Sequence, residues 1–124
     1  MDREILTKNK ARTGKIRSKM TSINDNEVYG GRSPIAVGAR LKLMRDAVGQ
    51  TQAAFADRMG LKQNTYAQLE GGRNYPNIPT LWTICDALQA EMVDMNWILA
   101  GDPSGLKNRF AQALKHLYDL RQRQ

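Results

Sequence analysis

The chain has 124 residues and a formal net charge of +7, with 19 Lys and Arg against 12 Asp and Glu. This length favours one compact domain with a tail. The single cysteine, Cys85, excludes an intramolecular disulfide and argues against a cysteine-based metal site. No apolar run of roughly 18 residues occurs, and charged residues occupy the N-terminus, where a secretory signal is apolar. We therefore expect a cytoplasmic protein without membrane contact.

The charge is uneven along the chain. Residues 1–33 carry a net charge of +4, and residues 34–77 and 102–124 each carry +3, whereas residues 78–101 contain three acids and no Lys or Arg. This distribution predicts a dipolar domain whose basic side faces a polyanion. Charge alone is equally compatible with ordinary surface variation.

Residues 1–33 predict a flexible basic arm. Their large apolar residues follow no sustained period, and Gly14, Gly30 and Gly31 interrupt the segment.

From Ile35 onward, apolar residues recur at helical spacing. Val37, Leu41, Met44 and Val48 predict a first helix, which Gly49 ends. A second short helix follows, with Thr51 as its N-cap and Gly60 as its stop. Residues 61–70 predict a third helix, which ends at Gly71 and Gly72.

The second half of the chain continues this pattern. A fourth helix has Pro79 in its first turn, a fifth ends at Gly101, and a last helix begins at Asp102 and Pro103. Trp82 and Trp97 are expected to pack in the core or at its rim. No strand-like alternation appears, so we predict an all-α fold. It comprises an arm (1–33), a five-helix domain (34–101) and an amphipathic C-terminal helix (102–124).

Residues 50–76 hold the most informative pattern. Two short helices meet at a tight turn, with a small residue, Ala56, at their crossing and Gly60 in the turn. The exposed positions of the second of these helices are Lys62, Gln63, Asn64 and Gln68. Amide side chains donate and accept hydrogen bonds at once, which suits base edges in the DNA major groove, adenine above all.

Residues 35–101 resemble the helix-turn-helix domains of lambdoid phage repressors and Cro proteins, the XRE-like regulators. The resemblance covers roughly half of the chain. The matching features are Arg45, Thr51-Gln52, Ala56, Gly60-Leu61, the run from Leu69 to Pro76 and the run from Asn96 to Gly101. In combination they are specific, whereas each alone is weak.

The resemblance implies a role for several residues. Base-reading positions would be Lys62, Gln63, Asn64 and Gln68, and backbone contacts would come from Gln52, Thr65, Arg73 and Asn74. Gln52 would also brace the recognition helix, and Arg45 and Glu70 would form an internal salt bridge. Tyr66 departs from the family, which has an aliphatic residue there, and Gly71 stands where the family often has Asn.

The implied function is sequence-specific binding of double-stranded DNA by a transcriptional regulator, most simply a dimeric repressor on an inverted-repeat operator. Such a protein is associated with the nucleoid when bound. The apolar stripe of the last helix either folds back on its own domain or pairs with a second copy. We favour pairing because these repressors usually bind as two-fold dimers. The stripe residues are Leu106, Phe110, Leu114 and Leu117.

The arm is either a passive tail or a segment that follows DNA. In the second case its contacts would be Lys8, Lys10, Arg12, Lys15, Arg17 and Lys19.

An alternative function is that of an antitoxin or antiactivator, which acts mainly by binding a protein such as a toxin, another regulator or polymerase. The sequence contains no converging acids, activated nucleophile, phosphate-binding glycine loop or metal-ligand spacing. We therefore expect no enzymatic activity, cofactor or metal.

Overall fold

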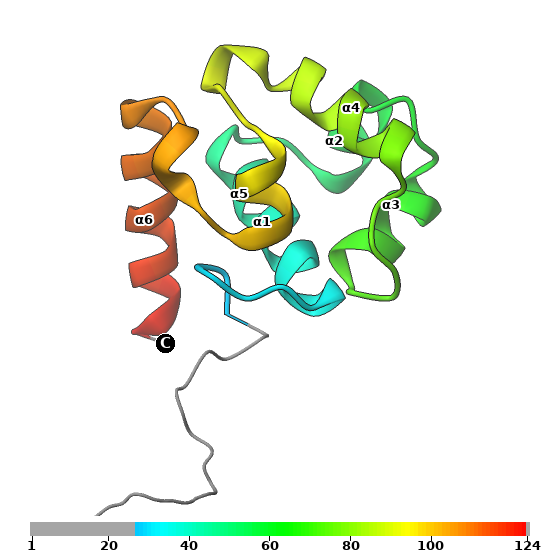
Figure 1. Cartoon of the computed structure of the whole chain (residues 1–124). Helices are drawn as coiled ribbons and strands as arrows, with labels where there is room; N and C mark the ends of the chain where they lie inside the picture. Colours follow the sequence, from blue (N-terminus) through cyan, green and yellow to red (C-terminus); the bar gives the residue numbers. More distant parts are fainter. Residues whose placement is uncertain (1–26, 124) are drawn as a thin grey trace, which may run out of the picture.

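The computed structural model describes residues 27–123, and the secondary structure in this range is entirely helical (Figure 1). The all-α prediction is confirmed. The six basic arm residues between Lys8 and Lys19 lie outside the described range. The helices are α1 (Pro34–Ala47), α2 (Gln52–Arg58), α3 (Gln63–Glu70), α4 (Ile78–Ala87), α5 (Met95–Ala100) and α6 (Asn108–Gln122), with 3₁₀ turns at Gln89–Glu91 and Pro103–Gly105.

Side-chain caps begin most of these helices. Thr51 accepts a hydrogen bond from the backbone N–H of Ala54 at 3.1 Å, as the sequence predicts. Ser33, Asn77 and Asp94 begin α1, α4 and α5 in the same way. Each cap satisfies a backbone donor that the first turn leaves without a partner.

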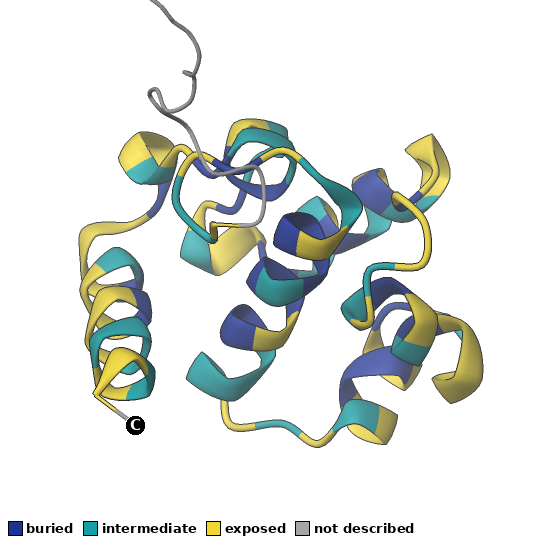
Figure 2. Cartoon of the chain, turned by 90° about the horizontal axis from the view of Figure 1, so that it is seen from below, coloured by how far each residue is buried: buried dark blue, intermediate teal, exposed yellow. Residues whose placement is uncertain are grey.

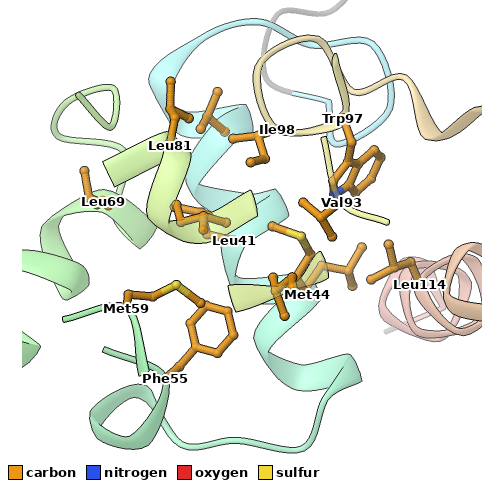
Figure 3. Packing of buried hydrophobic residues seen from close by; sticks show 14 of the residues in the cluster. Leu41, Met44, Phe55, Met59, Leu69, Leu81, Val93, Trp97, Ile98 and Leu114 are labelled. Carbon is orange, nitrogen blue, oxygen red and sulfur yellow. The ribbon is translucent and has the colours of Figure 1, made fainter. Parts of the chain in front are cut away.

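Helix α1 lies at the centre of the molecule, with α3 packed on one side and α6 on the other (Figure 1). One hydrophobic core joins all of the helices. In Figure 3, Leu114 of α6 lies in the same cluster as Met44 of α1 and Trp97 of α5. The two tryptophans differ, because Trp97 is fully buried and Trp82 is exposed.

The last helix begins later than the sequence predicts. Asp102 caps only the short Pro103–Gly105 turn, where its carboxylate accepts from the N–H of Ser104 at 3.0 Å. The chain then leaves this turn in an extended conformation at Leu106, so α6 begins at Asn108.

The apolar stripe of the last helix folds back on its own domain. Leu106, Phe110 and Leu114 are buried in the core of the same chain, and Leu117 packs half-buried against it. Figure 2 shows the outer face of α6 exposed and its inner face covered. An ion pair between Arg121 and Asp46 joins the end of α6 to α1. A second copy is therefore not needed to cover this stripe.

Residues 27–33 also belong to the folded unit, although the sequence pattern predicts that they are part of the arm. Their anchor is Arg40, which is fully buried in α1. Its guanidinium donates to three backbone carbonyl oxygens of the segment before α1, those of Val28 at 2.5 Å, Glu27 at 3.3 Å and Gly31. It also donates to the carbonyl oxygen of Ile98 in α5 at 2.9 Å. Burial lowers the pKa of Arg40 to about 10, so the group stays charged at neutral pH.

Candidate nucleic-acid interface

Helix α3 separates its polar and apolar residues cleanly. Tyr66 and Leu69 are buried against the core. The opposite face is open to solvent and consists of Gln63, Asn64, Thr65 and Gln68, with Lys62 just before the helix. The structure thus brings all four predicted base-reading residues to one exposed surface that carries no carboxylate.

The turn before α3 fixes how α2 and α3 meet. Ala56 is buried at their crossing, and its carbonyl accepts from the N–H of Leu61 at 2.9 Å. Gly60 has a φ of 70°, a conformation that glycine adopts at little cost. The small residue and the glycine together allow the compact helix-turn-helix arrangement that the sequence predicts.

An ion pair behind α3 ties it to α1 and α2. The Nε atom of Arg45 lies 2.6 Å from Glu70 Oε2, and its Nη2 atom lies 3.2 Å from Oε1. Gln52 Nε2 donates to the same Oε1 at 3.2 Å. The Glu70 side chain is only 7% exposed, so it braces the helix and is not offered to a ligand.

These contacts set the ionisation of Glu70. Burial alone would raise the pKa of Glu70, but the hydrogen bonds from Arg45 and Gln52 and the charge of Arg45 outweigh burial and hold the pKa below its ordinary value. The carboxylate is therefore charged at neutral pH, and its attraction to Arg45 is fully present.

Tyr66 fits in the core at a position where the resemblance implies an aliphatic residue. Its ring packs on Phe55, with ring centroids 5.4 Å apart, and its hydroxyl donates to the carbonyl of Leu41 at 3.4 Å. Burial raises the pKa of Tyr66 well above its ordinary value, so the hydroxyl stays protonated. The substitution adds core contact without leaving an unpaired polar group.

A direct backbone contact sets the distance between α1 and α3. A Cβ atom at Gly38 would lie 2.5 Å from the carbonyl oxygens of both Leu69 and Glu70. No side chain fits in that space, so α3 rests on the backbone of α1 itself. The sequence pattern did not single out Gly38, because a glycine inside a helix indicates only a residue of low helix propensity.

The loop after α3 carries two of the predicted backbone contacts. Arg73 and Asn74 are exposed. Next to them, the Tyr75 hydroxyl donates to the carbonyl of Arg32 at 2.7 Å, which ties the loop to the residues before α1. Gln52 is the least accessible of the predicted backbone contacts, because it is half-buried beside Glu70.

Residues 27–123 offer neither a metal site nor a membrane span. No group of three or more His, Cys, Asp or Glu side chains in that range could hold a metal ion. None of its helices is both long and apolar enough to cross a membrane.

The chain is similar in sequence to known proteins. The model of a helix-turn-helix domain family matches residues 36–103. The cryptic phage CTXphi transcriptional repressor RstR of Vibrio cholerae serotype O1 (strain ATCC 39315 / El Tor Inaba N16961) is 34% identical over 56 residues, which are 45% of this chain and 50% of that protein. The chain thus spans about half the length of this curated relative. No solved structure matches. Since the family match covers more than half of its residues, the chain belongs to the helix-turn-helix domain family.

Proposed function

We propose that this protein is a sequence-specific DNA-binding transcriptional repressor that places α3 in the major groove. The observation that carries this proposal is the exposed row of amides on α3, namely Gln63, Asn64 and Gln68. Amides of this kind pair with base edges, adenine above all. The ion pair of Arg45 and Glu70 holds the α3 backbone that carries these side chains in a fixed position, which base reading requires.

The remaining polar groups take supporting roles. Lys62 is shared between bases and phosphates, while Gln52, Thr65, Arg73 and Asn74 hold the DNA backbone. Such phosphate contacts position a protein on the duplex, and base contacts specify the sequence. The basic residues between Lys8 and Lys19 add phosphate contacts and strengthen binding to any sequence.

Repression follows from the presence of the bound protein on the promoter. A domain that covers promoter DNA blocks polymerase, and the name of the matched relative describes a transcriptional repressor. Two copies acting together read an inverted repeat, because a two-fold protein matches a two-fold site.

The first experiment is selection of binding sites from a random duplex pool at physiological salt, where non-specific phosphate binding is weak. We expect an enriched inverted repeat. Its half-site spacing gives the distance between the two recognition helices. A pool without enrichment contradicts the proposal and favours a protein-binding role.

The second experiment tests the recognition helix itself. Gln63→Ala and Gln68→Ala are each expected to cost about 1–3 kcal/mol of operator affinity and to relax specificity at the base pairs they read. The matched control is Gln112→Ala, which removes an exposed glutamine from α6 and should leave affinity unchanged. Unchanged operator affinity in both α3 variants removes the assignment.

A further inference from the structure

Helix α4 carries an apolar face that nothing covers in the described chain. Its inner residues, Leu81 and Ile84, are buried, whereas Ile78 is 61% and Trp82 is 59% exposed. Pro79 lies beside them and is exposed as well. A large aromatic residue next to an exposed isoleucine is the kind of surface that marks a protein interface.

The charge on this helix is placed unfavourably for an isolated α4. Asp86 is exposed and lies one residue before the end of the helix, at the negative pole of the helix dipole. The first turn contains no acid and the last turn contains no base. Both poles therefore lack the side-chain charge that stabilises a helix end.

The exposed residues Ile78, Trp82 and Asp86 of α4, here called the α4 stripe, are spaced symmetrically about Trp82. They follow one another at intervals of four residues, with Trp82 in the middle. In two antiparallel helices that cross at Trp82, the Asp86 carboxylate of each copy meets the first turn of the other. One arrangement then covers the apolar residues and places an acid at each positive pole.

We propose that a second copy of this chain covers the α4 stripe, with the two α4 helices antiparallel about a two-fold axis next to Trp82. This inference rests on the proposed function for the pairing of two copies. The structure favours α4 over α6 as the contact, since Phe110 and Leu114 of α6 are buried within their own chain, and Leu120, its one exposed large apolar residue, is less exposed than Ile78 or Trp82. In addition, α4 follows α3 directly through the 71–77 loop, whereas α6 lies across α1 from α3 (Figure 1).

The test is sedimentation of the full chain without DNA. Wild type is expected to be a dimer in the micromolar range, and Trp82→Glu should weaken the dimer about a hundredfold. The matched control is Met92→Glu, which places the same charge at a residue that is 58% exposed outside α4, and it should remain dimeric. Circular dichroism checks that both variants fold.

A second variant tests the polar half of the contact. Asp86→Arg brings a positive charge to the positive pole of the opposite helix and should weaken the dimer about tenfold. A monomeric wild type up to the high-micromolar range overturns the inference and assigns the stripe to a different protein. A Trp82→Glu variant that dimerises as well as wild type overturns it too.

DNA binding separates this inference from the proposed function. Trp82→Glu should bind a single half-site as wild type does and should lose only the gain from the second half-site. If the wild type binds no DNA sequence but still dimerises through Trp82, the proposed function fails and the dimer surface stands. If wild type reads DNA and the Trp82 variant keeps the full two-site affinity, the α4 surface fails alone.

Discussion

Glu70 connects the helices that build the candidate interface. It lies at the end of α3 and accepts hydrogen bonds from Arg45 of α1 and Gln52 of α2. Its pKa is below the ordinary value of 4.5 in the folded chain. The ion pair therefore stabilises the fold above about pH 4.5, and this contribution is lost as the pH falls through the folded-state pKa.

Replacing this carboxylate should change both stability and its pH dependence. We expect Glu70→Gln to lower the free energy of unfolding by about 1–3 kcal/mol at neutral pH, because Arg45 loses the closer of its two charged partners. The difference from wild type should shrink as the pH falls through the folded-state pKa of Glu70, which lies below 4.5, because the wild-type side chain is then protonated as well. Urea unfolding at a series of pH values measures this. Asp119→Asn, which breaks an exposed pair with Lys115, serves as the control with little effect. If the difference in unfolding free energy between Glu70→Gln and wild type stays the same at acid pH, the stabilising role of the Glu70 charge is contradicted.

The side chains that the sequence placed best are those with a local signature. The exposed amides of α3 and the cap at Thr51 follow from helical spacing and from cap chemistry. Arg40 had no such signature, since its partners are backbone carbonyls that any sequence supplies. Trp82 follows Leu81 on a helix that is apolar on most of its positions. The residue types in this helix therefore do not show that Leu81 is buried and Trp82 is exposed.

The segment 27–33 is an element that sequence patterns do not reveal. It has no regular helix, yet it supplies most of the oxygen atoms around the Arg40 guanidinium. Tyr29 from the same segment packs on Trp97 of α5 and Tyr118 of α6, with ring centroids 5.5 Å and 5.1 Å apart. The start of α6 was mispredicted for a related reason, because an Asp-Pro cap can begin a single turn as well as a helix.

Truncation at two positions distinguishes this segment from the residues before it. A chain that lacks residues 1–26 keeps all of the described contacts of residues 27–33 and is the reference for stability. Removal of residues 1–33 should cost about 3 kcal/mol or more, because Arg40 then stays buried without most of its acceptors. Thermal and urea unfolding of the two truncations measure the difference. Equal stability of the two chains contradicts the role of the segment.

The chain that lacks residues 1–26 also tests whether the arm touches DNA. If the basic residues between Lys8 and Lys19 bind phosphates, the truncated chain should show a weaker salt dependence of DNA affinity than the full chain. The log–log slope should become shallower by roughly 0.9 for each phosphate that the arm neutralises. An unchanged slope identifies the arm as a passive tail.

The helices share one hydrophobic core from α1 to α6, so the described chain should unfold as one unit. We expect the far-UV circular dichroism of all helices and the fluorescence of buried Trp97 to report the same urea midpoint. The measurement uses a Trp82→Phe background, so that Trp97 is the only tryptophan and its emission can be excited selectively. An earlier loss of helix signal, with Trp97 still native, would show that α6 detaches first and contradict a single core.

The close approach at Gly38 bears on how such a protein acquires new target sequences. Helix α3 rests on the backbone of α1, and the side chains on its outer face take no part in that packing. In the proposed function, positions 63, 64 and 68 can therefore be exchanged as a set while the helix keeps its depth in the groove. On that proposal, the position of the domain on the duplex and the sequence that it reads depend on different residues, so duplicated copies can diverge in operator without first rebuilding their fold.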